Sequence, residues 1–319
     1  MTRVDESIGR DLVGMLLAAG RGERTRQLGD VVAKPALDVL GRPLLASGLD
    51  HIRRFGATRC VVNLHRHPEQ VAAAVRQEAG SLEVEFSWEP ELLGGAGGLA
   101  AAAGFLGGGP VLVGNADTWA DLDLSALATA ARDDGVVLAL VPNLEPARWS
   151  TVSLASDGRV ARILPAGVAG SLSGYLFTGF QLIGPRVIAA LPPPPAEMHV
   201  VWDTLIDAGR LFGVVVTGSF AEAGTPLAYL RLVQARLDQR SWIHPGAKVG
   251  CGGEVQGSAI GVGCRVGEGA CVAASVLLAG AAVAPGARLT RCVAAGPVVA
   301  TGEHANALVL PQGVFGLAD

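Results

Sequence analysis

A six-residue apolar period runs through the last quarter of the chain, after Trp242. Apolar side chains recur at this interval, with shorter or irregular steps between the runs, at Ile243, Val249, Val255, Ile260, Val266, Val272, Val283 and Leu289. Glycine and other small residues fill the intervals, as in the strings HPGAK, GCGGE and GEGAC. Such a pattern is typical of a β-solenoid, in which short strands stack into coils around a narrow apolar core. It predicts a repeat domain over residues 240–319, with about three coils if each coil takes roughly 18 residues.

Between Leu12 and about Gly224, β-rich runs alternate with helical patterns. The strand patterns cover Leu12–Ala18, Arg59–Asn63, Glu83–Ser87, Pro110–Val113, Val136–Val141 and Tyr175–Ile183, with a hairpin at Thr151–Leu154 and Arg159–Leu164. The helical patterns cover Pro43–Phe55, Pro68–Glu78, Gly95–Phe105, Asp123–Ala131 and Thr225–Gln239. This alternation predicts a Rossmann-like, doubly wound α/β domain with a mixed sheet over residues 1–239. Ligands of such sheets bind at the carboxyl ends of the strands.

Composition limits the classes of function that the chain can have. Half of the 319 residues are hydrophobic and 17% are charged, which is enough apolar material for two domains with cores. The net charge of −4 and the lack of a long basic run argue against nucleic acid as a partner. Three long stretches carry no charge, at 92–116, 163–185 and 270–287. Glycines interrupt each of them, so we expect buried strands, loops and a repeat core rather than a membrane partner.

The N-terminal string MTRVDESIGRD is polar and lacks the apolar region of a secretory signal. The five cysteines form no C-x-x-C pair, and their spacing fits core positions of the repeat better than a metal cluster. We therefore expect a cytoplasmic protein with reduced thiols.

The segment 16–45 carries the clearest sign of a ligand. The apolar run VGMLLAA ends in a turn with Gly20 and Gly22, and cations follow at Arg24 and Lys34, as well as at Arg21 and Arg26. A strand that ends in a glycine turn is expected to present free backbone N–H groups, which suit phosphate oxygens. The string lacks both G-x-x-x-x-G-K-[ST] and G-x-G-x-x-G, so the two commoner phosphate loops are excluded. It predicts a cradle for a polyphosphate.

The whole segment resembles the signature of the sugar-1-phosphate nucleotidyltransferases, A-A-G-x-G-x-R, then K-P, then G-x-P-L-L. The matching residues are Ala18, Ala19, Gly20, Gly22, Arg24, Lys34, Pro35 and Gly41 to Leu45. Two departures lie inside it. The family usually has a Pro-Leu-Thr-like segment after the arginine and a proline before the lysine, where this chain has Gln27-Leu28-Gly29 and Ala33. The C-terminal repeat resembles the hexapeptide-repeat, left-handed parallel β-helices.

The resemblance implies two metal-binding carboxylates. Asp117 follows an apolar strand in the string Asn115-Ala116-Asp117, which is similar to an N-G-D-like family motif. Glu222 stands where the family usually has the aspartate of D-x-G-T. Magnesium takes one or two carboxylates together with phosphate oxygens. Without the resemblance, Asp117 would be interpreted as capping the next turn, and Thr225 as capping the next helix; the second interpretation is compatible with a metal site.

The resemblance also implies where base and sugar bind. The turn at Gly94, Gly95 and Ala96 resembles the family's E-x-x-L-G-T-A-G loop, which lies against the nucleobase, although Gly95 replaces the threonine. Thr178 and Gly179, in the string Phe-Thr-Gly, resemble the glycine strand that faces the sugar, and Asn115 is a further expected substrate residue. The usual Glu-Lys-Pro before that strand is replaced by Ile163-Leu164-Pro165.

Taken together, these motifs predict an enzyme that makes an NDP-sugar and pyrophosphate from a nucleoside triphosphate and a sugar 1-phosphate. The loops are most similar to the mannose-1-phosphate guanylyltransferase branch, and the heptose, N-acetylmuramate and glucose branches remain open. Arg24, Lys34 and Asp117 are the expected catalytic residues, Mg²⁺ the expected cofactor, and a homo-oligomer the expected assembly. Two alternatives remain open: a non-catalytic regulatory homologue, suggested by the departures, and acyl transfer at His244 or His304 of the repeat.

Overall fold

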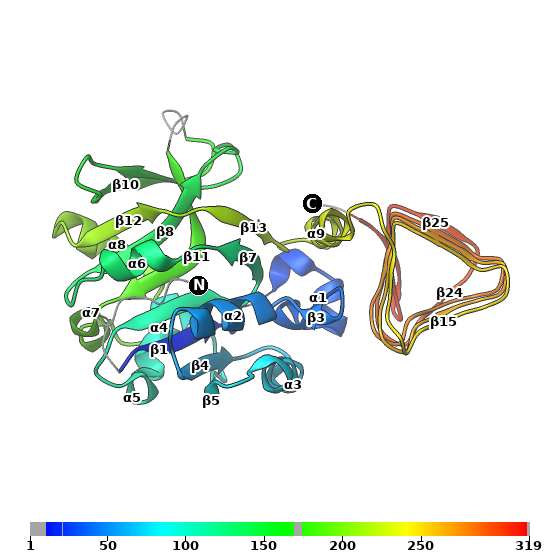
Figure 1. Ribbon diagram of the computed structural model, residues 1–319, viewed down its shortest axis with the longest axis horizontal. Coiled ribbons are helices and arrows are strands. Elements are labelled where there is room, and N and C mark those ends of the chain that lie inside the picture. The colour runs from blue at the N-terminus through cyan, green and yellow to red at the C-terminus, as the bar shows by residue number, and fades with distance from the viewer. Residues whose placement is uncertain (1–10, 21, 169–173, 318–319) are drawn as a thin grey trace. The chain divides into compact units, whose positions relative to one another are not determined.

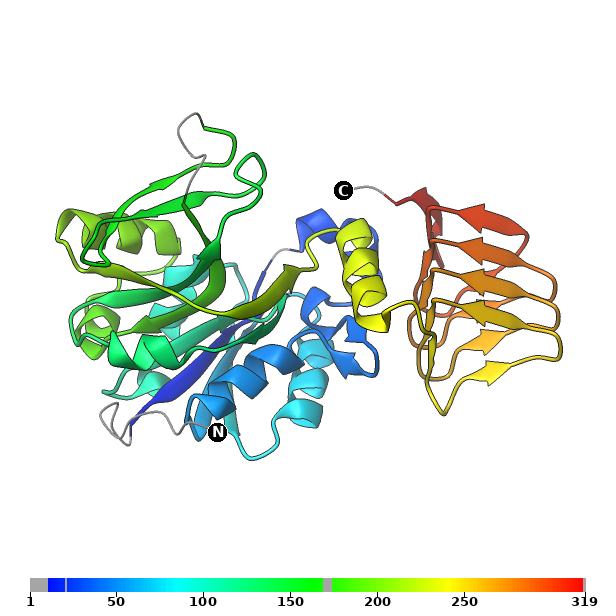
Figure 2. The same cartoon turned by 45° about the horizontal axis from the view of Figure 1, so that its top comes forward.

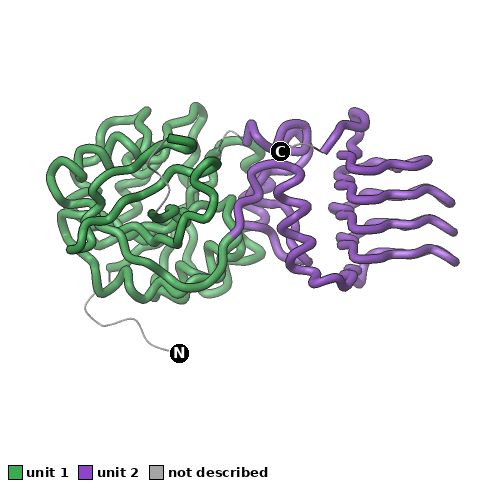
Figure 3. Tube along the Cα trace, turned by 90° about the horizontal axis from the view of Figure 1, so that it is seen from above, with its two compact units in different colours: residues 1–21, 45–68, 75–220 green, residues 22–44, 69–74, 221–319 purple. Residues whose placement is uncertain are grey.

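The computed structural model describes residues 11–20, 22–168 and 174–317. The chain forms two compact units, which Figure 3 shows in different colours. The first holds Met1–Arg21, Leu45–Pro68 and Val75–Phe220, and the second holds Gly22–Leu44, Glu69–Ala74 and Ala221–Asp319. The N-terminal residues 1–10, Arg21 and part of the charge-free stretch at 163–185 lie outside the described residues. The boundary at residue 239 stays a prediction.

The first unit is built on a nine-stranded mixed sheet (Figure 1). Its strands are β1 (Val13–Leu17), β4 (Arg59–Leu64), β5 (Glu83–Trp88), β6 (Val111–Asn115), β8 (Val136–Pro142), β9 (Thr151–Leu154), β10 (Val160–Leu164), β11 (Tyr175–Ile183) and β12 (Leu211–Val215). The main order is β10-β9-β11-β6-β1-β4-β5, and β8 pairs with both β11 and β12. Strands β1, β4, β5 and β6 are parallel, whereas β11 runs antiparallel to β6 and β8. The predicted mixed α/β fold is confirmed.

Helices follow most of the predicted patterns. They are α2 (Ala46–Arg54), α3 (Pro68–Glu78), α4 (Gly94–Ala101), α5 (Ala103–Leu106), α6 (Ser125–Thr129), α7 (Pro185–Ala189) and α8 (Met198–Asp207). The pattern at 95–105 predicted one helix, but the structure divides it at Ala102, where the backbone leaves helical geometry with ψ −2°. Helices α7 and α8 and strand β12 were not predicted. In the part of the chain that the structure describes, no helix combines the length and apolar character that a membrane crossing needs.

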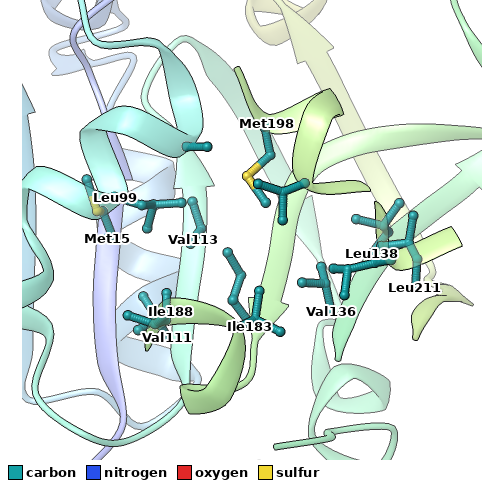
Figure 4. Packing of buried hydrophobic residues seen from close by; sticks show 14 of the residues in the cluster. Met15, Leu99, Val111, Val113, Val136, Leu138, Ile183, Ile188, Met198 and Leu211 are labelled. Atoms are coloured by element: carbon teal, nitrogen blue, oxygen red, sulfur yellow. The ribbon is translucent and has the colours of Figure 1, made fainter. Parts of the chain in front are cut away.

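The core of this unit lies between the sheet and the helices α4, α7 and α8 (Figure 4). Met15 on β1, Val113 on β6 and Leu99 on α4 are each 0% exposed. Strand β6 lies inside the sheet between β1 and β11, and its consecutive residues Val111, Leu112 and Val113 are each 0% exposed. Both faces of the strand are therefore covered, and its run of apolar residues needs no polar alternation. This explains the charge-free stretch at 92–116 as a buried strand with its helix, as predicted.

The second unit contains a β-helix with a triangular cross-section (Figure 1), whose coils stack in Figure 2. Three faces are formed by parallel stacks, which are β14-β17-β20-β23-β26, β15-β18-β21-β24 and β16-β19-β22-β25. These strands run from β14 (Trp242–Ile243), β15 (Lys248–Val249) and β16 (Glu254–Gln256) to β24 (Val299–Ala300), β25 (Glu303–Ala305) and β26 (Ala307–Leu310). A final antiparallel strand, β27 (Gly313–Gly316), pairs with β26. The handedness stays a prediction.

The expected size and number of the coils were wrong. Aligned positions Trp242, Ala259, Val276 and Val293 are 17 residues apart, and four complete coils form between residues 242 and 305. Within each of the first three coils, the inward apolar positions are six, six and five residues apart. The five-residue step that interrupts the six-residue period in the sequence is therefore a regular feature of one corner. Small alanines at inward positions also hide the later coils: Ala294 is 0% exposed and Ala300 is 1% exposed.

A ladder of hydroxyls runs through one corner of the β-helix. The N–H of Ser275 donates to Ser258 Oγ at 3.0 Å, and the N–H of Cys292 donates to Ser275 Oγ at 2.9 Å. Both serines are 0% exposed, and each hydroxyl donates in turn to a backbone carbonyl of its own coil. Buried polar groups are therefore paired from coil to coil, which removes the desolvation cost that they would otherwise carry.

The solenoid core predicts a sharp contrast between an inward and an outward apolar residue. Leu289 is 0% exposed, so Leu289→Ala removes buried methyl groups and leaves a cavity. We expect it to lower the free energy of unfolding by about 2–5 kcal/mol. Val299 is 59% exposed, and Val299→Ala should change stability by less than about 0.5 kcal/mol. Urea denaturation of the whole chain followed by circular dichroism measures both, and equal losses would contradict the assigned inward face.

Candidate functional site

The end of β1 is held by a buried side chain from the neighbouring strand. The N–H groups of Ala18 and Ala19 both donate to Oδ1 of Asn63, at 2.7 and 3.3 Å. These two N–H groups are therefore engaged within the protein, and the assignment of Ala18 and Ala19 to nucleotide binding stays a prediction. Gly20, the next residue, is exposed, and a Cβ built on it meets nothing within 4 Å. Gly22 has φ +63°, a left-handed conformation that favours glycine.

Asn63 also connects β1 to the second glycine-rich turn. Its Nδ2 donates to Oε1 of Glu89 at 2.7 Å, and the other oxygen, Oε2, accepts from the N–H of Leu93 at 3.2 Å. Asn63 is 3% exposed and Glu89 is 1% exposed, so this contact is dry and the carboxylate has fixed donors in place of water. The sequence analysis did not identify Asn63. Its signal was its place at the end of the strand beside β1, where Leu17 pairs with it.

The turn that precedes α4 requires glycine because another segment lies directly on it. Gly94 has φ +75°, and a Cβ there would lie 2.5 Å from the carbonyl oxygen of Ala196. The same carbonyl accepts from the N–H of Gly97 at 2.9 Å, and the N–H of Ala196 donates to Leu93 at 2.8 Å. The loop at Gly94, Gly95 and Ala96 is thus fixed on both sides before any ligand binds.

Asp117 lies in the turn between β6 and β7 (Thr118–Leu122). The N–H of Ala116 donates to the carbonyl of Leu17 at 3.0 Å, which joins the end of β6 to the end of β1. Two side chains of α2 hold β7 from the other side. Ser47 Oγ accepts from the N–H of Ala120 at 3.2 Å, and His51 Nε2 accepts from the N–H of Leu122 at 3.0 Å. The turn that carries Asp117 is therefore anchored on both flanks.

Strand β11 places Gly179 next to Asn115 of β6. Gly179 has φ +89° at an irregularity of β11, and a Cβ there would lie 3.1 Å from Nδ2 of Asn115. A larger residue would clash with that amide. Thr178 is 1% exposed, and its hydroxyl donates to the carbonyl of Ala139 at 2.9 Å. The Thr178 side chain therefore stabilises the pairing of β11 with β8. The side chain of Asn115 is more exposed than that of Thr178.

In the second unit, one carboxylate holds the two predicted cations. Arg24, in a 3-10 turn (Glu23–Thr25), places Nη2 2.5 Å from Glu222 Oε1, and Lys34 Nζ lies 3.5 Å from the same oxygen. Arg24 is 62% exposed, so solvent screens its part of the contact, whereas Lys34 is 9% exposed. Two cations on one carboxylate leave an excess positive charge, which suits a polyanion.

Glu222 was predicted to bind a metal, and the structure shows its Oε1 engaged with cations instead. Within the described ranges, no group of three or more His, Cys, Asp or Glu side chains could hold a metal ion by itself. Mg²⁺ needs only one or two carboxylates when phosphate oxygens complete its shell, so the carboxylate of Asp117 or of Glu222 fits this metal. Thr225 caps α9 (Pro226–Leu237), as the simpler interpretation predicted, because its Oγ1 accepts from the N–H of Ala228 at 3.1 Å.

The segment that departs from the family signature lies against the β-helix within the second unit. A Cβ on Gly296 would lie 2.9 Å from Cγ1 of Val31, and Leu28 is 0% exposed. Gly41, further along the segment, has φ +90° and lies against the Trp242 ring. A Cβ on Gly41 would be 2.8 Å from Cζ2 of that ring. In this chain, the segment that departs from the family signature therefore packs against the β-helix at Gly296, and Gly41 packs against Trp242 at the first coil.

Comparison with known proteins identifies the family. The family model described as nucleotidyl transferase matches residues 13–165. An N-acetylmuramate alpha-1-phosphate uridylyltransferase of Neisseria meningitidis is 31% identical over 236 residues, which are 72% of this chain and 98% of that relative. The chain therefore belongs to the nucleotidyl transferase family, and the resemblance found in its motifs is confirmed. Its members generally use a divalent metal.

Other relatives extend the range of bases and sugars. A mannose-1-phosphate guanylyltransferase catalytic subunit beta of Drosophila pseudoobscura is 26% identical over 233 residues, 70% of this chain and 62% of that relative. The solved structure of HddC from Yersinia pseudotuberculosis complexed with GMP-PN has a TM-score of 0.61 at 22% identity, over 70% of this chain and 99% of that one. A putative glucose-1-phosphate thymidylyltransferase of Bacillus anthracis gives 0.63 at 19% identity, over 71% and 96%. These structures support the fold.

Two glycines of α4 provide a test of the buried hydrogen bond between Asn63 and Glu89. A Cβ on Gly98 would lie 2.7 Å from Glu89 Oε1 and 2.9 Å from Asn63 Nδ2, so Gly98→Ala should break their hydrogen bond. We expect a loss of about 1–3 kcal/mol in the free energy of unfolding. Gly95→Ala is the control, because its Cβ would lie 3.4 Å from Met198 Cβ. Urea denaturation compares them, and a tolerated Gly98→Ala would refute the proposed tightness of the contact.

His51 predicts a loss of stability in mild acid. Burial lowers its pKa below the ordinary value of 6.5, with a further lowering from Arg54 that carbonyl contacts and Asp121 oppose. Because the unfolded chain binds the proton first, stability present above about pH 6.5 is lost as the pH falls, by up to about 1.4 kcal/mol per pH unit. The free energy of unfolding should fall less steeply from pH 7.5 to 5.5 in His51→Gln than in the parent. Equal slopes would contradict this assignment.

Proposed function

We propose that this protein transfers a nucleotidyl group from a nucleoside triphosphate to a sugar 1-phosphate and releases pyrophosphate. The observation that carries the proposal is the pair of cations, Arg24 and Lys34, that one carboxylate orients directly after an open glycine turn. Gly20 and Gly22 supply that turn, and we assign the phosphate backbone contacts to them because the N–H groups of Ala18 and Ala19 are already paired. The family membership supports the same reaction.

The chemistry asks little of the protein beyond positioning and charge. The phosphate oxygen of a sugar 1-phosphate is already anionic, so no general base is required. It attacks the α-phosphorus in line, forms the new P–O bond, and the bond to pyrophosphate breaks. Lys34 would bridge the α-phosphate and the incoming phosphate, and Arg24 would neutralise the departing β- and γ-phosphates. Held by Glu222, both cations need little reorganisation when the charge moves.

We propose Mg²⁺ as the divalent metal and Asp117 as its ligand, with Glu222 as a second candidate. A bound Mg²⁺ would polarise the phosphoryl oxygens and offset their charge. The anchored turn between β6 and β7 supports Asp117, because a fixed carboxylate suits the strict geometry of Mg²⁺. Glu222 would take this part through Oε2, while its Oε1 keeps the contacts with Arg24 and Lys34, or by exchanging those contacts for the metal.

Two branches are the first candidates for the base and the sugar, and the heptose and glucose branches remain open. The sequence motifs are most similar to the mannose-1-phosphate guanylyltransferases, of which several relatives are 24–27% identical. The N-acetylmuramate 1-phosphate uridylyltransferases reach 31%. We therefore propose UTP with N-acetylmuramate 1-phosphate and GTP with mannose 1-phosphate as the first pairs to test. We further propose that the β-helix drives self-association, because solenoid faces are extended and regular.

A pyrophosphate-release assay over a matrix of nucleoside triphosphates and sugar 1-phosphates, with and without Mg²⁺, tests the function. We expect magnesium-dependent turnover of at least one pair. Binding of an NDP-sugar without turnover of any pair would instead support the regulatory alternative, and consumption of acetyl-CoA would support acyl transfer at the repeat.

Loss of one charged group should remove most of the activity without unfolding the chain. Arg24→Ala removes the partner of the leaving phosphates, and Asp117→Ala removes the proposed metal ligand. Each should lower kcat by about 10²–10³. Arg186→Ala and Asp203→Ala, at exposed positions of α7 and α8, are the matched controls and should keep parent activity. Steady-state kinetics with circular dichroism as a check of folding decides this, and near-parent turnover of Arg24→Ala or Asp117→Ala would refute the assigned role.

A further inference from the structure

One glutamine of the second unit holds the backbone immediately before Lys34. Gln70, the third residue of α3, accepts at Oε1 from the N–H of Ala33 at 2.8 Å. Its Nε2 donates to the carbonyl of Val31 at 3.2 Å. One side-chain amide thus pairs with a donor and an acceptor on either side of Val32, as a neighbouring strand would.

The clamped segment has no regular structure of its own. Helix α1 (Leu28–Val31) ends before it, and the 3-10 turn that carries Lys34 (Lys34–Ala36) begins after it. Val32 has φ −130° and ψ 129°, and Ala33 has φ −57° and ψ 132°. Fixing the backbone of a residue costs conformational entropy, so an extended connection of this kind needs a hydrogen bond from a neighbouring element to hold it.

The backbone at residue 33 has the geometry that proline imposes. Proline locks φ near −65° and carries no N–H, and Ala33 lies within that range at −57°. Val32, before it, has the extended conformation that a residue preceding proline requires. The same geometry is therefore obtained here by a hydrogen bond that a proline at this position could not donate.

We propose that Gln70 is a positioning residue for Lys34. By fixing residues 31–33, the clamp sets where the lysine leaves the backbone and so keeps Nζ in reach of Glu222 and the phosphates. The inference rests on the proposed function of Lys34. Gln70 itself is exposed and lies outside the core, so its replacement leaves the folded chain intact.

The test uses three variants and a control in the full chain. Gln70→Ala removes the clamp, and we expect kcat to fall roughly tenfold with little change in KM, because Lys34 acts mainly in the transition state. Gln77→Ala, at an exposed position of the same helix, should leave kcat unchanged. Ala33→Pro alone should keep near-parent kcat, since the exposed Gln70 side chain can turn away. Gln70→Ala combined with Ala33→Pro should recover most of the lost activity, because the ring restores the same φ.

Hydrogen exchange measured by mass spectrometry on peptides that span residues 30–37 gives a readout independent of turnover. We expect faster exchange in Gln70→Ala, parent exchange in Gln77→Ala, and slower exchange in the double variant than in Gln70→Ala. Parent kcat and parent exchange in Gln70→Ala would overturn the proposal, and so would a double variant as slow as Gln70→Ala. If the parent chain turns over no substrate pair, the proposed function fails, while the exchange data still decide whether the clamp exists.

Discussion

The hydrogen bonds of the buried Asn63 side chain are the constraint on which the candidate site residues of the first unit depend. This amide accepts from the end of β1 and donates to Glu89, whose other oxygen holds the start of α4. The end of β1 and the start of the glycine turn before α4 are therefore joined by one hydrogen-bond network. Asn63 and Glu89 are 3% and 1% exposed, so removing either side chain leaves buried polar groups without water or protein to pair with. The geometry of these two segments is set by this network before a ligand arrives.

The second unit holds two cations, Arg24 and Lys34, close together. Glu222 offsets the repulsion between Arg24 and Lys34 and orients both. Around them, the β-helix and Gln70 fix the backbone where the chain departs from its family's signature. The departing residues Leu28 and Ala33 therefore have local structural roles: Leu28 is 0% exposed, and the N–H of Ala33 donates to Gln70.

Local patterns predicted the elements, but not the contacts between distant residues. The bounds of α3 were predicted as observed, because a proline begins it and its apolar positions follow a helical period. The number of coils was wrong because Ala294 and Ala300 take inward positions that an apolar period does not show. Asn63 and Gln70 escaped notice because their partners lie 45 and 37 residues away in sequence, and an isolated amide carries no motif.

The most direct test of nucleotidyl transfer is isotope exchange in the reverse direction. Labelled pyrophosphate is incubated with the chain, Mg²⁺ and a panel of NDP-sugars, and label in the nucleoside triphosphate is measured. A single in-line displacement predicts labelled triphosphate with at least one NDP-sugar, and none when the NDP-sugar is left out. Binding of an NDP-sugar without any label in the triphosphate would contradict the account.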